Sequence, residues 1–237
     1  VGVEDVPPGE GPLVVGHVEL EHEAVVHVRA LRAVDVHGAA VPELFQEVAE
    51  PVAGDAVVPE NPVTGGVSAE PGTRERLLDV ARHVKQDWLE DGFAITNDLL
   101  DACAKAQKLK VGRGDHLLIR TGQMERCLKS GNWGAYAGGD APGVKFENCY
   151  WSHEKKIAAI CSDTWGVEVR PNETTEANQP WHWVVIPSMG LCMGEIFYLK
   201  ELAEDCENDG VYEFFFCGPP LIITGGTGSP INPQAMK

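Results

Sequence analysis

Two residues in the second half of the chain could do chemistry, His182 and Glu195. His182 lies in the segment Pro-Trp-His-Trp-Val-Val-Ile-Pro (180–187), and Glu195 follows Met193 and Gly194. An imidazole and a carboxylate at the ends of two elements can bind a divalent cation together or work as an acid–base pair. A structural histidine and a glutamate favoured by a helix dipole would explain the same residues. The residues alone leave both interpretations open.

A second candidate position is the pair Asp163 and Thr164. These residues follow the apolar run Ile157–Cys161, which we predict to be a buried strand. In α/β folds the residues just beyond the carboxyl ends of strands commonly form binding sites. We therefore expect Asp163 and Thr164 to lie near the site. Trp151, Trp165 and two further tryptophans, Trp181 and Trp183, either line an aromatic pocket or fill the core.

Three histidines near the N-terminus, His17, His22 and His27, alternate with glutamates and are also potential ligands. On a strand, residues five apart point to opposite faces, so the three imidazoles cannot converge. A solvated acidic face is the preferred interpretation. From His17 to Ala30, apolar and polar residues alternate, which predicts a half-buried strand.

Two short motifs favour structural roles. Arg113-Gly114-Asp115 lies where a turn must precede a strand. The glycine-rich segment Gly225–Ser229 resembles a phosphate-binding loop, but Pro230 and Pro233 prevent a helix from starting directly after it. We expect a tight backbone loop there.

From residue 73 onward, strand and helix patterns alternate, which predicts a mixed β-sheet covered by helices, an α/β fold. Expected strands are 76–81, 116–120, 157–161, 183–186, 211–217 and 221–224. Expected helices run from Thr96 or Asn97 to Gln107, over 146–155 and over 194–208. In this scheme His182 starts a strand and Glu195 starts a helix.

Composition divides the chain into two parts. Residues 1–72 hold 13 acidic and 2 basic residues, and 18 of the 72 are valine. No Lys, Ile, Met, Trp, Tyr or Cys occurs before Val84. We predict an atypical acidic, Val-rich segment over 1–72 and an α/β domain over 73–237. The segment is a separate β-rich module, a flexible acidic arm or an out-of-frame product.

Charge and cysteine content indicate which partners and which cellular location to expect. With 19 Lys and Arg against 36 Asp and Glu, the formal charge is −17. This excess argues against nucleic acid or an anionic membrane as the partner. The sequence shows neither a membrane-spanning run nor a secretory signal. Seven cysteines without a Cys-x-x-Cys pair are typical of reduced, packed thiols, so a cytoplasmic location is expected.

Several segments, taken in order, resemble the cyclase family of metal-dependent amidohydrolases, which includes kynurenine formamidases and isatin hydrolases. The similarity covers about residues 76–237. It is carried by RLLDVARH (76–83), GRGDHLLIRTG (112–122), GGDAPGV (138–144), IAAICSDTWGVE (157–168), PWHWVVIPSMGLCMGEIFYL (180–199) and FFFCGPPLIITGGTGSPINP (214–233).

The resemblance implies a swivelling β/β/α domain, usually a homo-oligomer, that hydrolyses a C–N amide bond. The implied substrate is a small molecule of the N-formyl or cyclic amide type, and the implied cofactor is Zn²⁺ or Mn²⁺. His182 and Glu195 match the late pair of metal-site residues. A bound cation would polarise the carbonyl group and lower the pKa of a water molecule.

One part of the family pattern is missing. The early motif, His-x-Gly-Thr-His-x-Asp-x-Pro-x-His or a variant, supplies most metal ligands and is not found upstream of Arg76. No catalytic base is therefore assigned. Two alternatives remain: an active amidohydrolase whose site is completed by other residues, and a non-catalytic member without the metal site that serves as a binding module.

Overall fold

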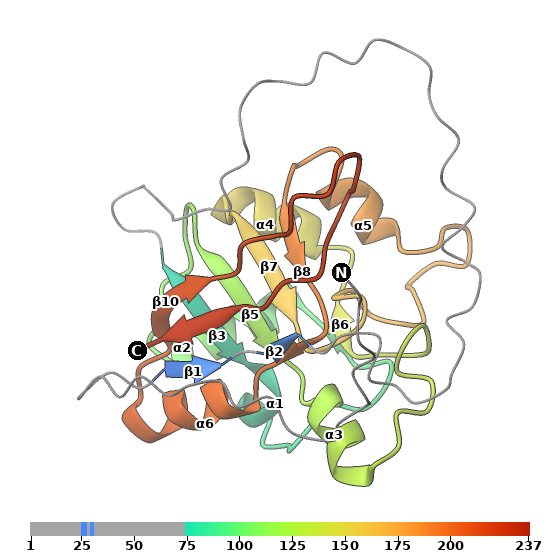
Figure 1. Cartoon of the computed structure of the whole chain (residues 1–237). Coiled ribbons are helices and arrows are strands. Elements are labelled where there is room, and N and C mark those ends of the chain that lie inside the picture. The colour runs from blue at the N-terminus through green and yellow to red at the C-terminus, as the bar shows by residue number, and fades with distance from the viewer. Residues whose placement is uncertain (1–24, 28, 31–73) are drawn as a thin grey trace, which may run out of the picture.

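The computed structural model describes residues 25–27, 29–30 and 74–237 of the chain (Figure 1). Its largest sheet contains β1 (Val25–His27), β3 (Glu75–Asp79), β5 (His116–Arg120), β7 (Ala159–Ser162), β8 (Cys192–Gly194), β10 (Glu213–Cys217) and β11 (Gln234–Met236). The strand order is β1-β11-β10-β3-β5-β7-β8. Strands β3, β5, β7 and β8 run parallel, whereas β10, β11 and β1 pair antiparallel. The predicted mixed α/β fold is confirmed.

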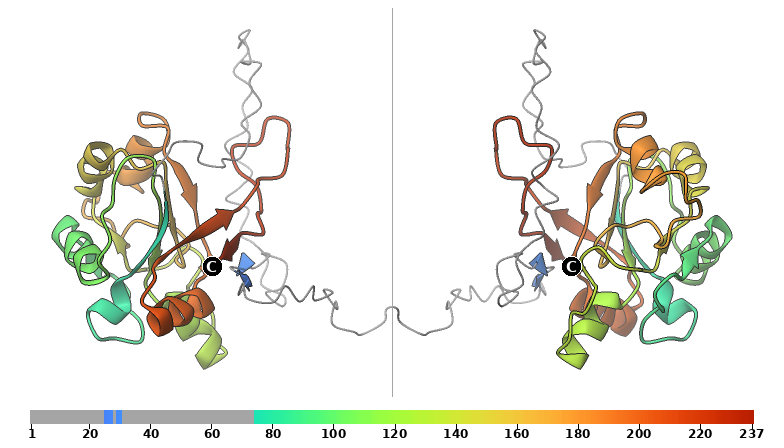
Figure 2. Two further views of the ribbon diagram at one scale, coloured as in Figure 1. Left: turned by 90° about the vertical axis from the view of Figure 1, so that its left-hand side faces the viewer. Right: turned by 90° about the vertical axis from the view of Figure 1, so that its right-hand side faces the viewer.

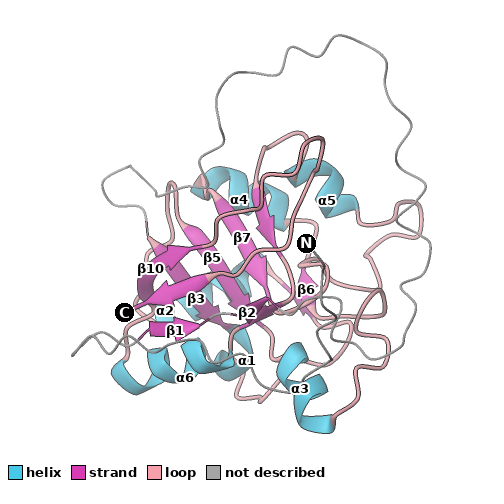
Figure 3. Cartoon of the chain, viewed as in Figure 1, coloured by secondary structure: helices cyan, strands magenta, loops and turns pink. Residues whose placement is uncertain are grey.

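Two short pairs of strands lie beside the main sheet. One joins β2 (Arg29–Ala30) to β9 (Phe197–Tyr198), and the other joins β4 (Ala94–Ile95) to β6 (Gly143–Val144). The six helices of the described part are α1 (Val80–His83), α2 (Asn97–Ala106), α3 (Gln123–Ser130), α4 (Asn148–Lys155), α5 (Pro180–Val185) and α6 (Lys200–Asp209) (Figure 3).

Apolar residues fill both faces of the sheet, because its central strands carry leucines at consecutive positions. Leu78 and Leu117 face the larger core, to which α1, α2, α4 and α5 contribute. Leu77 and Leu118 face the opposite way and pack against α6 and β10. Figure 2 shows α2 and α4 on one side of the sheet and α6 on the other. Burial on both faces explains why these strands are uniformly apolar.

Three predicted elements have the expected limits. Helix α2 begins after Thr96, whose hydroxyl accepts a hydrogen bond from the Leu99 amide at 3.2 Å, a typical N-cap. Strand β5 coincides with the prediction, and α4 lies within the predicted helix. Asp115 of the Arg-Gly-Asp motif is buried and accepts bonds from the amides of Arg74 and Gly112, so this motif has a structural role.

Other predicted elements were wrong. Residues 183–186 are not a strand, since Pro180–Val185 form helix α5. Proline is well placed in its first turn, and the buried side chains Trp181 and Val185 lie four residues apart on one helix face.

The later part of the chain also departs from prediction. The helix predicted over 194–208 begins at Lys200, because Gly194 continues β8 and Phe197–Tyr198 form β9. Residues 221–224 form no strand: Leu221, Ile222 and Ile223 are exposed and follow two prolines. Strand β11 was not predicted.

Most of the N-terminal segment lies outside the described residues. Strands β1 and β2 fall within the predicted strand over 17–30, where β1 pairs with β11 and β2 with β9. His17, His22 and the division at residue 72 are not covered, so the two-part organisation stays a prediction. All seven cysteines are free thiols and five of them are buried, which agrees with the expected packing. No helix in the part that the structure describes is long and apolar enough to cross a membrane.

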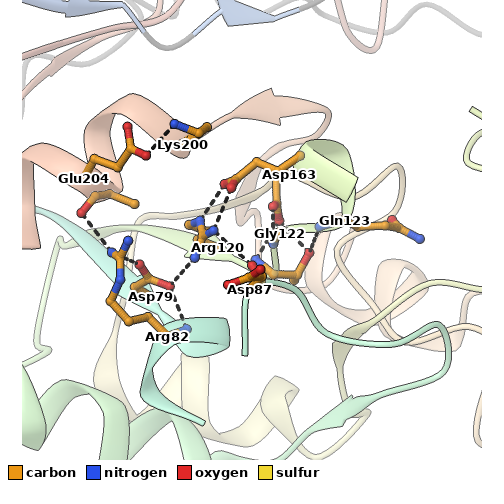
Figure 4. A network of polar contacts seen from close by, with 12 residues as sticks. Asp79, Arg82, Asp87, Arg120, Gly122, Gln123, Asp163, Lys200 and Glu204 are labelled. Carbon is orange, nitrogen blue, oxygen red and sulfur yellow. Dashed lines mark hydrogen bonds and ion pairs between the residues drawn. The ribbon is translucent and has the colours of Figure 1, made fainter. Parts of the chain in front are cut away.

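A buried carboxylate joins the carboxyl ends of β5 and β7. Asp163 is 1% exposed and accepts hydrogen bonds from the Thr121 amide at 2.8 Å, the Thr121 hydroxyl at 2.7 Å and the Gly122 amide at 2.6 Å (Figure 4). Beside it, the Arg120 guanidinium donates to Asp79 and Glu125. Burial raises the pKa of Asp163 to about 6, although the hydrogen bonds from Thr121 oppose this shift.

Gly122 fixes the turn that reaches Asp163, and this can be tested by substitution. Its φ is +78°, and an added Cβ would lie 2.5 Å from the Asp87 carbonyl oxygen and 2.8 Å from Trp88 Cα. At Gly131, where φ is +66°, an added Cβ would meet nothing within 4 Å. We expect Gly131→Ala to cost about 1–2 kcal/mol for the left-handed backbone alone. Gly122→Ala should cost clearly more, because a backbone clash is added.

Urea denaturation of both variants measures this difference. Equal losses of stability in Gly122→Ala and Gly131→Ala would contradict the close approach at Gly122.

Candidate metal-binding site

His182 lies between two carboxylates, one at each ring nitrogen. Its Nδ1 lies 3.0 Å from Oε1 of Glu168, and its Nε2 lies 3.3 Å from Oε1 of Glu195. The three side chains differ in exposure: Glu168 is 3% exposed, His182 15% and Glu195 36%. The site therefore has a buried side at Glu168 and an accessible side at Glu195.

The two carboxylates keep the imidazole charged. Burial by itself lowers the pKa of His182, but the hydrogen bonds and negative charges of Glu168 and Glu195 outweigh it and raise the pKa to about 9. At neutral pH both ring nitrogens thus carry hydrogen and donate. A ligand histidine must release one of these protons, and only Nε2 faces the accessible side.

Helix α5 holds His182 through its neighbour Trp181. The indole of Trp181 is fully buried, and its Nε1 donates to Oδ1 of Asn148 at 3.2 Å. The Trp181 amide donates to Oε2 of Glu168 at 2.9 Å. Glu168 therefore contacts two consecutive residues of α5, one through each carboxylate oxygen. This fixes the histidine ring and the first turn of the helix together.

Strand β6 holds the backbone of Glu168. Val144 donates to the Val167 carbonyl at 2.9 Å and accepts from the Val169 amide at 3.0 Å. Gly143 makes this approach possible, because a Cβ there would lie 2.3 Å from the Val167 carbonyl oxygen. Glu168 was not among the residues predicted for the site. The available signal was its place in the segment 157–168, five residues after Asp163.

Glu195 does not start a helix, contrary to the prediction. It lies between β8 and β9, and His182 lies within α5 rather than at the start of a strand. The two residues nevertheless come together as predicted. Strand β8 pairs in parallel with β7, which brings Glu195 to the same end of the sheet as Asp163 and Thr164. The Ile196 amide donates to the Thr164 carbonyl at 2.9 Å.

The facing atoms of His182 and Glu195 fit one cation. Zn²⁺ binds imidazole nitrogen and carboxylate oxygen at roughly 2.0–2.2 Å, so tetrahedral neighbours lie roughly 3.3 Å apart. The separation between Nε2 and Oε1 is 3.3 Å. Glu168 cannot join them, because it contacts the opposite ring nitrogen. Within residues 74–237, no group of three or more His, Cys, Asp or Glu side chains could hold a metal ion. The described residues thus offer two candidate ligands.

The other candidates have different surroundings. Trp151 and Trp181 belong to the core, whereas Trp183 is 71% exposed. A hollow of about 350 Å³ lies along α3 and the segment after it, and its lining includes Gln123, Trp133 and Tyr136 but neither His182 nor Glu195. The loop Gly225–Ser229 is exposed.

Comparisons with known proteins agree with this architecture. Residues 70–169 match the family model described as putative cyclase. A solved structure of a novel cyclase is 35% identical, with a TM-score of 0.62 over 69% of this chain. Over the matched residues the chain is similar to the cyclase family.

More distant cyclase-like structures share the fold. An isatin hydrolase bound to the product analogue thioisatinate is 23% identical, with a TM-score of 0.54 over 70% of this chain and 60% of that one. Isatin hydrolase A from Ralstonia solanacearum is 20% identical, with a TM-score of 0.54 over 69% of this chain and 59% of that one.

The chain spans only part of these relatives. The match covers 53% of the novel cyclase and about 60% of the isatin hydrolases. Among curated proteins, none matches the chain. The predicted resemblance to the cyclase family and the cyclase-like fold are thereby confirmed, and the roles of His182 and Glu195 remain predictions.

The charged state of His182 leads to a pH prediction for the metal-free chain. Its pKa is about 9 in the fold and roughly 6.5 in the unfolded chain, so the fold binds the extra proton between these values. The stabilisation is complete below about pH 6.5 and is lost as the pH rises through 9. Its upper limit is on the order of 3 kcal/mol.

The measurement compares unfolding free energies of the wild type and His182→Gln from pH 6 to pH 10, in the presence of a chelator. We expect the advantage of the wild type to shrink with rising pH. An advantage that is constant across this range would show that His182 is not held as a cation.

Proposed function

We propose that the protein is a metal-dependent hydrolase of a C–N amide bond. The observation that carries this proposal is the pair His182 and Glu195, whose Nε2 and Oε1 atoms are separated by the distance expected for two ligands of one cation. The pair lies at the carboxyl end of the parallel strands, where α/β enzymes bind their substrates. The similarity to cyclases and isatin hydrolases supports the same class of reaction.

His182 and Glu195 would hold the ion, with Zn²⁺ or Mn²⁺ as the proposed metals. When bound, such an ion polarises the amide carbonyl and supplies hydroxide at neutral pH. The remaining ligands and the catalytic base would come from residues outside the described part. Glu168 would keep the proton on Nδ1, orient the ring and leave Nε2 as the only donor to the ion.

The proposed substrate is a small N-formyl or cyclic amide, as for a kynurenine formamidase or an isatin hydrolase. A bound imidazole and one carboxylate leave a net positive charge on a divalent ion, which suits a carbonyl oxygen as the next ligand. The cytoplasmic location, the homo-oligomer and the absence of nucleic-acid and membrane partners stay predictions.

Metal content is the decisive measurement. We expect elemental mass spectrometry of the purified full chain to find about one Zn²⁺ or Mn²⁺ per chain, because His182 and Glu195 would supply two of its ligands. His182→Asn and Glu195→Gln should each lose most of it, since each removes one ligand. His153→Asn is the matched control, because His153 is an exposed histidine on α4. Its metal content should equal that of the wild type.

Activity is measured with N-formylkynurenine and with isatin, before and after chelation. We expect hydrolysis of one of them that disappears on chelation and returns with added metal.

A second candidate is a cyclase-family protein that has lost catalysis and acts as a binding module. It is favoured by the presence of only two suitably placed ligands among the described residues. A folded wild-type chain without bound metal, inactive even after metal is added, would support this candidate and refute the hydrolase.

A further inference from the structure

Two β-branched residues adopt a left-handed backbone beside the carboxylates that contact His182. Val167 has φ +50° and directly precedes Glu168; Ile196 has φ +62° and directly follows Glu195. Positive φ is a strained conformation for valine and isoleucine, and it persists only where surrounding contacts enforce it. Some contact must therefore hold each of the two turns.

Thr164 provides a contact to both. Its hydroxyl oxygen accepts a hydrogen bond from the Val167 amide at 3.1 Å, and its carbonyl oxygen accepts one from the Ile196 amide at 2.9 Å. Thr164 is fully buried, and its hydroxyl lies 3.3 Å from Ser162 Oγ, so the hydroxyl can donate there while accepting from Val167. One residue thus links the turns on the two sides of the imidazole.

The end of β7 keeps Thr164 in place. Its preceding residue, Asp163, is bound by the Thr121 and Gly122 amides, and β7 pairs with β5 on one side and β8 on the other. A displacement of Thr164 would require these contacts to break. The residue is therefore a rigid reference point for both carboxylates.

We propose that Thr164 is a positioning residue that sets Glu168 and Glu195 on His182 by holding the two strained turns. Its hydroxyl controls the Glu168 side, and its carbonyl controls the Glu195 side. The catalytic consequence rests on the proposed hydrolase function, whereas the positioning itself is a property of the metal-free chain.

Thr164→Val separates the two sides, because it removes the hydroxyl and keeps the carbonyl. We expect Glu168 to move away from His182, since the Val167 amide loses its acceptor. The measurement is NMR of the imidazole nitrogens of the metal-free full chain. Exchange of the Nδ1 hydrogen with solvent should accelerate roughly tenfold or more, because the Glu168 carboxylate no longer accepts this hydrogen.

Two variants serve as controls. Thr164→Ser retains the hydroxyl and should restore slow exchange. Thr121→Val is the matched control, because Thr121 is also a fully buried threonine beyond the end of a strand and undergoes the same substitution. The hydroxyl that it loses donates to Asp163 rather than accepting from Val167. This variant should lower the stability of the fold while exchange at His182 Nδ1 stays as in the wild type.

The proposal is overturned if Thr164→Val leaves exchange at Nδ1 unchanged, or if Thr121→Val accelerates it equally. Should Thr164→Val not fold, Thr164→Ala removes the same hydroxyl without adding a β-branched side chain. Faster exchange is again expected, because the Val167 amide loses the same acceptor. Unchanged exchange in a folded Thr164→Ala chain would also overturn the proposal.

A second readout uses Zn²⁺ alone, in competition with a chelating dye. Loss of an orienting partner typically weakens metal binding by roughly 10–100-fold, and we expect Thr164→Val to fall at the lower end. Thr164→Ser should bind as the wild type does. If the wild type binds no Zn²⁺, the hydrolase proposal fails, and the NMR result still decides the role of Thr164.

Discussion

The carboxyl end of β7 is the constraint on which the site depends. The backbone amides of Thr121 and Gly122 both donate to one buried carboxylate, that of Asp163. Ionising a buried carboxyl group is unfavourable without such donors, so the turn after β5 and the end of β7 must form together. Thr164 is the next residue, so its position is fixed as well. The turns at Val167 and Ile196 are held in turn, because their amides donate to Thr164.

Electrostatics around His182 favour a cation at Nε2. A protonated imidazole between two carboxylates has a net charge of −1, and loss of its Nε2 proton would leave −2. A divalent ion that replaces this proton would bring the net charge to zero, whereas the single proton brings it only to −1. The most accessible of the three groups, Glu195, lies on this same side. The buried pair of Glu168 and His182 is then an orienting contact, whose cost of burial is offset by the Trp181 amide.

Local signals in the sequence were sufficient for several elements. The Thr96 cap, the Gly-rich turn before His116 and the continuous apolar run of β7 depend on neighbouring residues, and the corresponding elements were predicted. Helix α5 was mistaken for a strand because its aromatic and β-branched residues have high strand propensity. Its helical form is decided by the burial of Trp181 and Val185 against the core, which is a tertiary effect.

The site shows the same division between local and distant information. His182 and Glu195 could be selected because they match a family motif, although their surrounding elements were assigned wrongly. Glu168 was not selected, although it lies in the motif segment 157–168, because its contact with His182 depends on the left-handed turn at Val167 and on the close approach of Gly143. Valine is an improbable residue for positive φ, so no local rule predicts this turn.

Strain next to both carboxylates suits the proposed cation site, because its candidate ligands would be held in position before an ion binds. Relaxed turns at Val167 and Ile196 would let Glu168 and Glu195 separate from each other and lower the repulsion between them. The surrounding contacts prevent this: β6 binds the backbone on both sides of Glu168, and Thr164 binds both turns. The fold thus keeps two carboxylates on one imidazolium, and the proposed cation would find its two candidate ligands already in position.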